Sequence, residues 1–257
     1  MFGRLSIFEK SAKPTLWTAC VPEGVRVYVV GDIHGRLDLL TALHDSIEED
    51  GKAGADRRVI VYIGDYVDRG DDSKKIIDEL LQHPLPGFES VYLKGNHEDA
   101  LLRFLEHPEF GRDWFSFGGD ATVYSYGVPV PAGIRTDEQL QQIQTVFRDA
   151  FPEAHLRFLS ELRLCYEIGD YFCVHAGIKP GRALDRQQPE DMMWIRDEFL
   201  DSDKLHGKVI VHGHSITDVP DVQENRIGID TGAYYSNRLT CLVLEGNTRR
   251  FLETSID

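Results

Sequence analysis

The sequence predicts an α/β protein with a largely parallel sheet, and three observations support this. In the first half of the chain, an apolar strand, a short polar loop and an amphipathic helix follow one another three times. The polar loops recur at nearly constant intervals, since Asp32 and Asp65 are 33 residues apart and Asp65 and Asn96 are 31 apart. This is close to the length of a βαβ unit. Such loops meet at the carboxyl edge of the sheet, where open α/β sheets bind ligands.

The three units of the first half are defined by their hydrophobic pattern. Apolar, β-branched runs predict strands over 25–30, 58–63 and 90–93. Segments 37–49, 73–83 and 100–107 are expected to be helices because their apolar residues recur at helical spacing. In the first two helices these apolar residues are Leu39, Leu40, Leu43 and Ile47, then Ile76, Ile77, Leu80 and Leu81.

The second half has a different pattern. Residues 100–162 are predicted to form a mostly helical insert, with an irregular aromatic stretch at 113–127 and a helix around 137–151. From Leu164 short strands dominate, beginning with a hairpin that turns at Gly169-Asp170. Further strands are expected within 208–215, 226–232 and 238–253, completing a second set. We therefore expect one domain over 1–257, with two packed sheets, helices outside, and the helical insert between the two halves.

Composition and charge narrow the possible functions. The chain is 42% hydrophobic and 28% charged, as in ordinary globular proteins, and its formal net charge of −15 argues against nucleic acid or anionic membrane surfaces as partners. No apolar run reaches the roughly 18–20 residues of a membrane span, and the first residues lack the pattern of a signal peptide. We expect a cytoplasmic protein. The four cysteines show no CxxC spacing and are expected to be reduced thiols in the core: Cys20, Cys165, Cys173 and Cys241.

Six polar side chains follow or end predicted strands, and their types are those of metal ligands. They are Asp32, His34, Asp65, Asn96, His175 and His214. Carboxylate, imidazole and amide oxygen without thiolate suit Mn²⁺, Fe or Zn²⁺, and a shared carboxylate can join two ions about 3.5–4 Å apart. We expect two divalent metal ions. Mn²⁺ is our first choice, and Fe and Zn²⁺ are alternatives because the same ligand types bind them.

The motifs that carry these residues resemble a known family. "GDIHG", "GDYVDRG" and "GNHE", followed by "VHAG" and "GH", resemble the signature of the phosphoprotein phosphatases, a family of dinuclear metallophosphoesterases. The likeness to bacterial and bacteriophage serine/threonine protein phosphatases extends from about Val27 to Leu244 and includes "MWIRDEF" and "GIDTGAYYSNRLTCLVL". It implies the calcineurin-like fold, an α/β/β/α sandwich of two mixed sheets flanked by helices.

The resemblance also implies roles for the ligand residues. A first metal would be held by Asp32, His34 and Asp65, and a second by Asp65, Asn96, His175 and His214, with Asp65 bridging. A metal-bridging hydroxide would attack phosphorus in line, without a phosphoenzyme intermediate.

Further residues match positions that handle the phosphoryl group. His97 resembles the general acid that protonates the leaving group, and Asp68 the carboxylate that orients it. Asn96, Arg69 and Arg196 resemble phosphate-binding residues. Lys94 departs from the family pattern, in which many relatives have arginine, so contact of Lys94 with phosphate is in doubt.

Several residues have a plainer interpretation. His212 lies two residues before His214 on a predicted strand, so the two side chains share a face. We expect His212 to pack next to the metal ligands without binding metal, and the alternative is that His212 rather than His214 is the ligand. Arg36 is expected at a solvated helix start, with the phosphate rim as the alternative. The aromatic residues of the insert would line the substrate site or anchor the insert: Trp114, Phe115, Tyr124 and Tyr126. Gly118 and Gly119 are expected in a tight loop, and five histidines on the surface: His44, His83, His107, His155 and His206.

Three functions remain open. The first is hydrolysis of phosphoserine or phosphothreonine in proteins, where the protein substrate comes only from the resemblance. The second is a nucleotide phosphohydrolase such as a symmetrical diadenosine tetraphosphatase. That subgroup tends to have Ala-Arg-Gly where this chain has Asp68-Arg69-Gly70, which favours the protein phosphatase. The third is a binding module without catalysis, which the complete ligand set disfavours.

Overall fold

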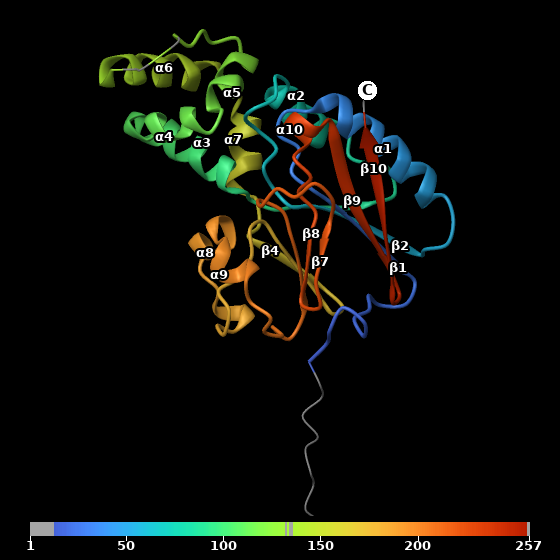
Figure 1. Ribbon diagram of the computed structural model, residues 1–257. Coiled ribbons are helices and arrows are strands. Elements are labelled where there is room, and N and C mark those ends of the chain that lie inside the picture. Colours follow the sequence, from blue (N-terminus) through green and yellow to red (C-terminus); the bar gives the residue numbers. More distant parts are fainter. Residues whose placement is uncertain (1–12, 132, 134–135, 256–257) are drawn as a thin grey trace, which may run out of the picture.

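The computed structural model describes residues 13–131, 133 and 136–255, and these form two five-stranded sheets packed face to face with helices outside (Figure 1). The first sheet has the order β10-β9-β1-β2-β3, and the second β4-β5-β6-β8-β7. In the first sheet, β1 (Val25–Val30), β2 (Arg57–Tyr62) and β3 (Glu89–Tyr92) run parallel, as the repeated strand-loop-helix unit predicts. The α/β/β/α architecture is therefore confirmed.

The last hairpin, β9 (Arg238–Glu245) and β10 (Thr248–Ser255), belongs to the first sheet. Its assignment to the second set of strands was wrong, because β9 pairs antiparallel with β1 from Arg26–Glu245 to Val30–Cys241. Residues 239–244 are buried throughout, which suits a strand inside a sheet that is covered on both faces.

The second sheet begins with the predicted hairpin of β4 (Cys165–Ile168) and β5 (Tyr171–Val174), which turns at Gly169-Asp170. Strand β6 (Val209–His212) pairs in parallel with β5, and β8 (Arg226–Gly228) pairs in parallel with β6. The edge is the two-residue β7 (Asp221–Val222), antiparallel to β8.

Helices α1 (Leu37–Gly51) and α2 (Ser73–Gln82) match their predictions, whereas α3 (Asn96–Glu106) begins four residues earlier than expected. Its early start has a local cause: the Glu98 carboxylate accepts the Gly95 N–H at 3.0 Å and so closes the first turn. Asn96 and His97 are therefore helical residues in the first turn of α3, shortly after β3.

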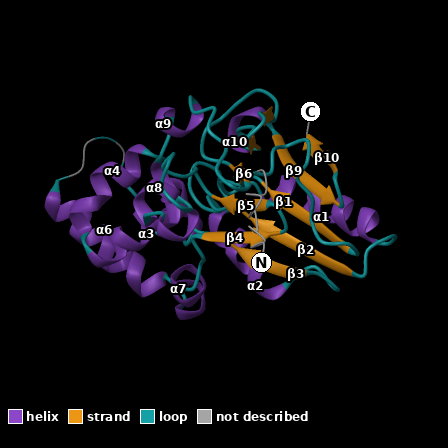
Figure 2. Cartoon of the chain, turned by 90° about the horizontal axis from the view of Figure 1, so that it is seen from below, coloured by secondary structure: helices purple, strands orange, loops and turns teal. Residues whose placement is uncertain are grey.

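The insert is helical, as predicted, and gathers at one end of the sheets (Figure 2). It continues from α3 through η1 (Pro108–Phe110), α4 (Gly111–Ser116), α5 (Gly119–Ser125), α6 (Asp137–Ala150) and α7 (Glu153–Ser160). The expectation of an irregular stretch at 113–127 was wrong, since α4 and α5 occupy most of it. Their aromatic residues pack inward: Trp114 and Phe104 lie 5.0 Å apart between ring centroids, and Trp114 and Phe147 lie 6.0 Å apart.

The alternation of β1 divides the core between two layers. Val27 and Val29 face the second sheet, while Tyr28 and Val30 face α1, α2 and the insert. The outer face of the second sheet is covered by a smaller cluster around Phe172 and Phe199, to which α8 (Pro189–Trp194) and α9 (Asp197–Leu200) contribute. The remaining elements are the short η2 (Leu184–Arg186) and α10 (Ala233–Ser236).

Two expectations about buried residues were wrong in part. Only Cys173 and Cys241 are buried, whereas Cys165 is half-buried and Cys20 exposed, and all four are free thiols. Among the five histidines expected on the surface, His83 and His107 are exposed and His206 is half-buried.

His44 and His155 lie in the core instead. Each is tied to a tyrosine hydroxyl at 2.8 Å, His44 to Tyr62 and His155 to Tyr126. The hydrogen bond pairs the polar groups of both side chains. A histidine can then be buried without the free-energy cost of an unpaired polar group, which is why it need not lie on the surface.

No helix among the described residues is long and apolar enough to cross a membrane. The cytoplasmic location stays a prediction, and the first twelve residues, on which the expectation about a signal peptide rested, lie outside the described part of the chain.

Candidate active site

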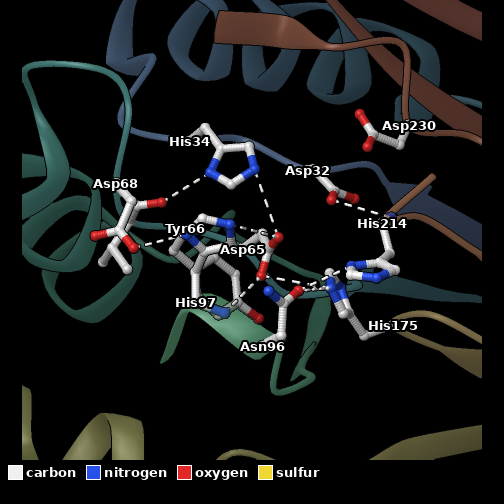
Figure 3. Close-up of polar contacts among 12 residues, drawn as sticks. Asp32, His34, Asp65, Tyr66, Asp68, Asn96, His97, His175, His214 and Asp230 are labelled. Carbon is white, nitrogen blue, oxygen red and sulfur yellow. Dashed lines mark hydrogen bonds and ion pairs between the residues drawn. The ribbon is translucent and has the colours of Figure 1, made fainter. Parts of the chain in front are cut away.

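Six side chains from both sheets meet at the carboxyl ends of their strands (Figure 3). They are Asp32 and His34 after β1, Asp65 after β2, Asn96 after β3, His175 after β5 and His214 after β6, each at most 6% exposed. The two sheets pack face to face, so the loops of the first sheet and those of the second open on the same side. The fold thereby brings together all six residues for which the sequence predicts a metal site.

The backbone that presents these residues is strained. Among the described residues, six other than glycine have positive φ, and five of them lie in this site: His34, Asp65, Asp68, Arg69 and His214, with φ between 45° and 71°. Such conformations cost of order 1–3 kcal/mol each and tend to occur where function requires them. Hydrogen bonds between the loops offset this cost, for example His34 N–H to the Asp65 carbonyl at 2.9 Å and Gly70 N–H to the His34 carbonyl at 3.1 Å.

Asp65 lies at the centre of the cluster. Its Oδ2 is 3.4 Å from His34 Nε2, and its Oδ1 is 3.4 Å from His175 Nε2. The Asn96 Oδ1 lies 2.9 Å from both His175 Nε2 and His214 Nδ1. Asp65 therefore faces ligand atoms on both sides, as a bridging carboxylate must.

The donor set fits divalent cations. Two buried polar atoms of the cluster, Asp32 Oδ1 and His214 Nε2, have no hydrogen-bond partner among the described residues, and in a protein interior such atoms usually have one. Two groups of side chains bring ligand atoms within 4.8 Å of one another, one formed by His34, Asp65 and His97 and the other by Asp65, His175 and His214. Oxygen and imidazole ligands without thiolate suit Mn²⁺, Fe or Zn²⁺.

The electrostatics of the protein residues agree with this fit. Burial, together with the charges of Asp230 and Asp65, raises the pKa of Asp32 well above its usual range. Burial also acts to raise the pKa of Asp65, but the surrounding imidazoles, His175 first, lower it overall. Burial lowers the pKa of His34 well below its usual value, so its imidazole is neutral and free to act as a ligand. Cations at this place would offset the repulsion between Asp32 and Asp65.

His97 and Asp68 form a closely bonded pair beside the cluster. The His97 Nδ1 lies 2.6 Å from Asp68 Oδ2, and both side chains are at most 2% exposed. Burial lowers the pKa of His97, but the carboxylates of Asp65 and Asp68 outweigh it and raise the pKa overall. The protonated imidazole that a general acid requires is thereby favoured.

Two residues of the insert hold Asp68 in place. The Trp114 indole N–H donates to Asp68 Oδ2 at 2.8 Å, and the Thr122 hydroxyl donates to Asp68 Oδ1 at 2.6 Å. Trp114 is fully buried and so lines no open surface, and Phe115 and Tyr126 are buried as well, which confirms the anchoring interpretation for these three. Tyr124 is 55% exposed, and its hydroxyl donates to the Val130 carbonyl at 2.6 Å. Nothing in the sequence pattern indicated that the insert supports the acid pair.

The two predicted phosphate-binding arginines lie near different members of the cluster, Arg69 near His34 and Arg196 near His214. Arg69 is half-buried, and its guanidinium lies over the ring of Tyr234 at 4.6 Å from the centroid. Arg196 is exposed, and its Nη1 is 3.4 Å from the carbonyl of His214. Both therefore adjoin metal-ligand candidates while keeping guanidinium N–H groups for an anion.

Lys94 and Arg36 have other partners. The Lys94 ammonium bonds Asp99 at 3.0 Å and lines a cavity of about 690 Å³ among α3, α6 and α7, away from the cluster. Arg36 lies at the start of α1, as expected, but it is largely buried rather than solvated: its Nη1 donates to the Ala233 carbonyl at 2.8 Å and to Asn237 Oδ1 at 2.7 Å. Arg36 thus fixes α10 against the start of α1.

His212 lies outside the cluster, although the alternation of a strand would place it on the same face as His214. The strand β6 ends at His212, and the left-handed φ of His214 turns the two side chains apart. His212 packs on Phe199 at 5.1 Å between ring centroids, and burial lowers its pKa to about 4. Of the two histidines, the structure therefore places His214 at the site.

Two site residues escaped the sequence analysis. Asp230, in "GIDTG", is buried beside Asp32 (Figure 3), and burial raises its pKa to about 6. It lies near the end of a predicted strand segment, as His214 does, and in the structure it follows β8. This position could have revealed it. The second is Glu98 of "GNHE", whose fully buried carboxylate accepts four backbone N–H groups: those of Asp65, Tyr66, Val67 and Gly95, at 2.8–3.3 Å.

We expect Glu98→Gln to destabilise the fold by about 2–4 kcal/mol, because the amide NH₂ would face backbone N–H donors and leave them unpaired. Chemical denaturation measures this loss. Glu106→Gln, at an exposed position on the same helix, is the matched control and should change the free energy of unfolding by less than about 0.5 kcal/mol. Similar effects of the two changes would mean that Glu98 does not support the loop.

The chain matches the family of calcineurin-like phosphoesterases over residues 25–242. It belongs to this family. Calcineurin-like phosphoesterases are metal-dependent hydrolases, so the chain is a metallophosphoesterase. Its resemblance to phosphoprotein phosphatases is thus confirmed at the level of the wider family, while the serine/threonine type is not.

Three individual proteins to which the chain is similar share at most 27% sequence identity with it. The bis(5′-nucleosyl)-tetraphosphatase PrpE (asymmetrical) of Oceanobacillus iheyensis is 27% identical over 235 residues, covering 84% of this chain and 87% of the relative. A solved structure titled a putative diadenosine tetraphosphatase is 23% identical, with a TM-score of 0.57 and coverage of 90% and 95%. A protein serine/threonine phosphatase from Saccharomyces cerevisiae is 16% identical, with a TM-score of 0.53 and coverage of 91% and 81%. The two structures support the fold.

Proposed function

We propose that this metallophosphoesterase hydrolyses bis(5′-nucleosyl) tetraphosphates, cleaving them asymmetrically. The observation that carries the proposal is the match to a relative of that name along 84% of this chain and 87% of the relative. It favours the nucleotide phosphohydrolase, the second of the functions left open, over the protein phosphatase. That relative is named as asymmetrical, which agrees with the departure of Asp68-Arg69-Gly70 from the pattern of symmetrical enzymes.

The ligand residues keep the roles that their sequence motifs imply. Asp32, His34 and Asp65 would hold one divalent ion, and Asp65, Asn96, His175 and His214 a second. Such ions, when bound, lower the pKa of water and draw negative charge from phosphoryl oxygens. The chain itself fixes the ligands by burial and by hydrogen bonds between their loops, so that little reorganisation is needed on substrate binding.

The remaining residues act on the phosphate chain. Arg69, Arg196 and the Asn96 amide would bind phosphoryl oxygens, and His97, oriented by Asp68, would donate a proton to the leaving oxygen. In asymmetrical hydrolysis, water adds to the first phosphorus, the bond from that phosphorus to the bridging oxygen breaks, and AMP and ATP leave. The leaving ATP needs little acid assistance, because the oxygen of its terminal phosphate carries the developing negative charge well.

A second candidate is a serine/threonine protein phosphatase. The acid pair favours it: a histidine held at 2.6 Å by a carboxylate that itself accepts two further hydrogen bonds is suited to protonating a poor alkoxide leaving group. The open position of Arg196 would also admit a peptide.

We expect the Mn²⁺-loaded protein to hydrolyse diadenosine tetraphosphate with a kcat/KM at least about tenfold above that for phosphoserine and phosphothreonine peptides, a difference of about 1.4 kcal/mol in transition-state binding. Chromatography should show AMP and ATP rather than ADP alone. Protein treated with a chelator is the control and should be inactive towards both substrates. Faster hydrolysis of the peptides would establish the second candidate instead.

A further inference from the structure

We propose that Phe117 and Trp194 form an aromatic platform at the mouth of the site that stacks against a nucleobase of the substrate. The proposal deepens the proposed function, on which it rests for the class of substrate. The two rings lie 6.1 Å apart between centroids and are inclined by 57°.

The position of the two rings ties them to the reacting centre. The Phe117 ring lies 6.3 Å from that of His97, and the Trp194 ring lies 6.3 Å from that of His214. The platform thus extends from the proposed general acid to a proposed metal ligand.

Both rings are open to a ligand. Phe117 is 38% exposed and Trp194 is half-buried, although aromatic side chains of this size gain from full burial. The insert offers an apolar core to Trp114 and Phe115 only a few residues away. Phe117 lies outside that core, because the turn that follows it is hydrogen-bonded to the loop of Arg69.

Phe117 caps the end of α4, and the turn from α4 into α5 is fixed by two glycines, Gly118 and the first helical residue Gly119. Gly118 has φ of 99°, and its carbonyl accepts the Arg69 N–H at 3.1 Å. A Cβ at Gly119 would lie 2.4 Å from the Trp114 ring, so the chain approaches that ring as only glycine can. These contacts place Phe117 beside His97, in an edge arrangement, rather than in the core.

Each ring lies next to an arginine segment. Phe117 precedes the residue that bonds Arg69, and Trp194 is two residues before Arg196. A ligand that engages the arginines with an anionic chain and the rings with a flat aromatic group has the chemistry of a nucleotide. Stacking on aromatic side chains tolerates any base, because every base has a π-face.

The test compares two ligands that differ only by adenosine: adenosine 5′-(α,β-methylene)diphosphate and methylenediphosphonate. Neither has a P–O–P bond. With Mn²⁺-loaded protein, titration calorimetry should show roughly tenfold tighter binding of the adenosine compound, the order expected from one stacked base. In Phe117→Leu and in Trp194→Leu, which keep an apolar side chain, this preference should fall to about twofold or less while methylenediphosphonate binds as before.

Trp17→Leu is the matched control, since Trp17 is 74% exposed on the segment before β1, at the opposite end of the strands, and its change should leave the preference intact. Equal binding of both ligands by the unaltered protein would overturn the proposal, as would variants that keep the tenfold preference. Equal loss of affinity for both ligands would also overturn it, because the rings would then serve the phosphate subsite. The proposed function is tested by a different measurement. It would be contradicted if the protein did not hydrolyse diadenosine tetraphosphate, whatever the binding comparison shows.

Discussion

Replacing His97 by alanine should slow hydrolysis of an alkyl phosphomonoester such as phosphoserine by roughly 10²–10⁴-fold, the usual contribution of a positioned general acid. The loss should be below about tenfold for 4-nitrophenyl phosphate and for diadenosine tetraphosphate, whose leaving groups are stable without a proton. The physical basis is the buried 2.6 Å contact of His97 with Asp68, which keeps the imidazole protonated and oriented. Steady-state kcat/KM on the three substrates measures the effect.

Two further variants test the same assignment. Asp68→Asn removes the carboxylate but keeps its shape, so we expect a loss on phosphoserine that is smaller than that of His97→Ala. His83→Ala changes an exposed histidine of the described chain and should leave all three rates unchanged. Equal losses on all three substrates in His97→Ala would remove His97 from the role of acid and assign it to binding or to the fold.

Replacing Asp65 by asparagine should abolish metal binding together with activity. Asp65 is the carboxylate with ligand atoms on both sides, His34 Nε2 and His175 Nε2, each at 3.4 Å. Loss of its charge should weaken Mn²⁺ binding by more than the roughly 10–100-fold typical of residues that only support a ligand. Elemental analysis should find about two ions per chain in the unaltered protein and less than one in the variant, and calorimetry should give the change in affinity.

Asp71→Asn is the matched control, because Asp71 is an exposed carboxylate on the same loop. It should keep metal content and activity. Retention of both ions at normal affinity in Asp65→Asn would show that Asp65 is not the bridge. Less than one ion per chain in the unaltered protein, with no gain from added Mn²⁺, would instead revive the binding module without catalysis.

The sequence was a good guide to which six polar side chains come together, and a poor guide to the residues that support them. Asp32, Asp65 and Asn96 could be found because each follows a strand at a regular interval, and parallel strands bring such positions to one edge. Trp114 could not be assigned to Asp68, since the two are 46 residues apart and no periodicity connects them. Buried His44 and His155 were missed for a similar reason, because their tyrosine partners lie on other elements.

The sequence by itself determined the type of this protein: the strand-loop-helix repeat defined an α/β fold, and the five motifs indicated a metallophosphoesterase. The motifs also predicted which side chains would hold the metal ions. Tertiary structure decided which histidine of "VHGHS" joins the cluster, because a left-handed φ at His214 turns it away from His212. It also decided the placement of the last hairpin beside β1 and the positions of Phe117 and Trp194 at the site. The physical reason is that periodicity along the chain encodes local structure, whereas contacts between distant segments depend on shape and hydrogen bonding that arise only on packing.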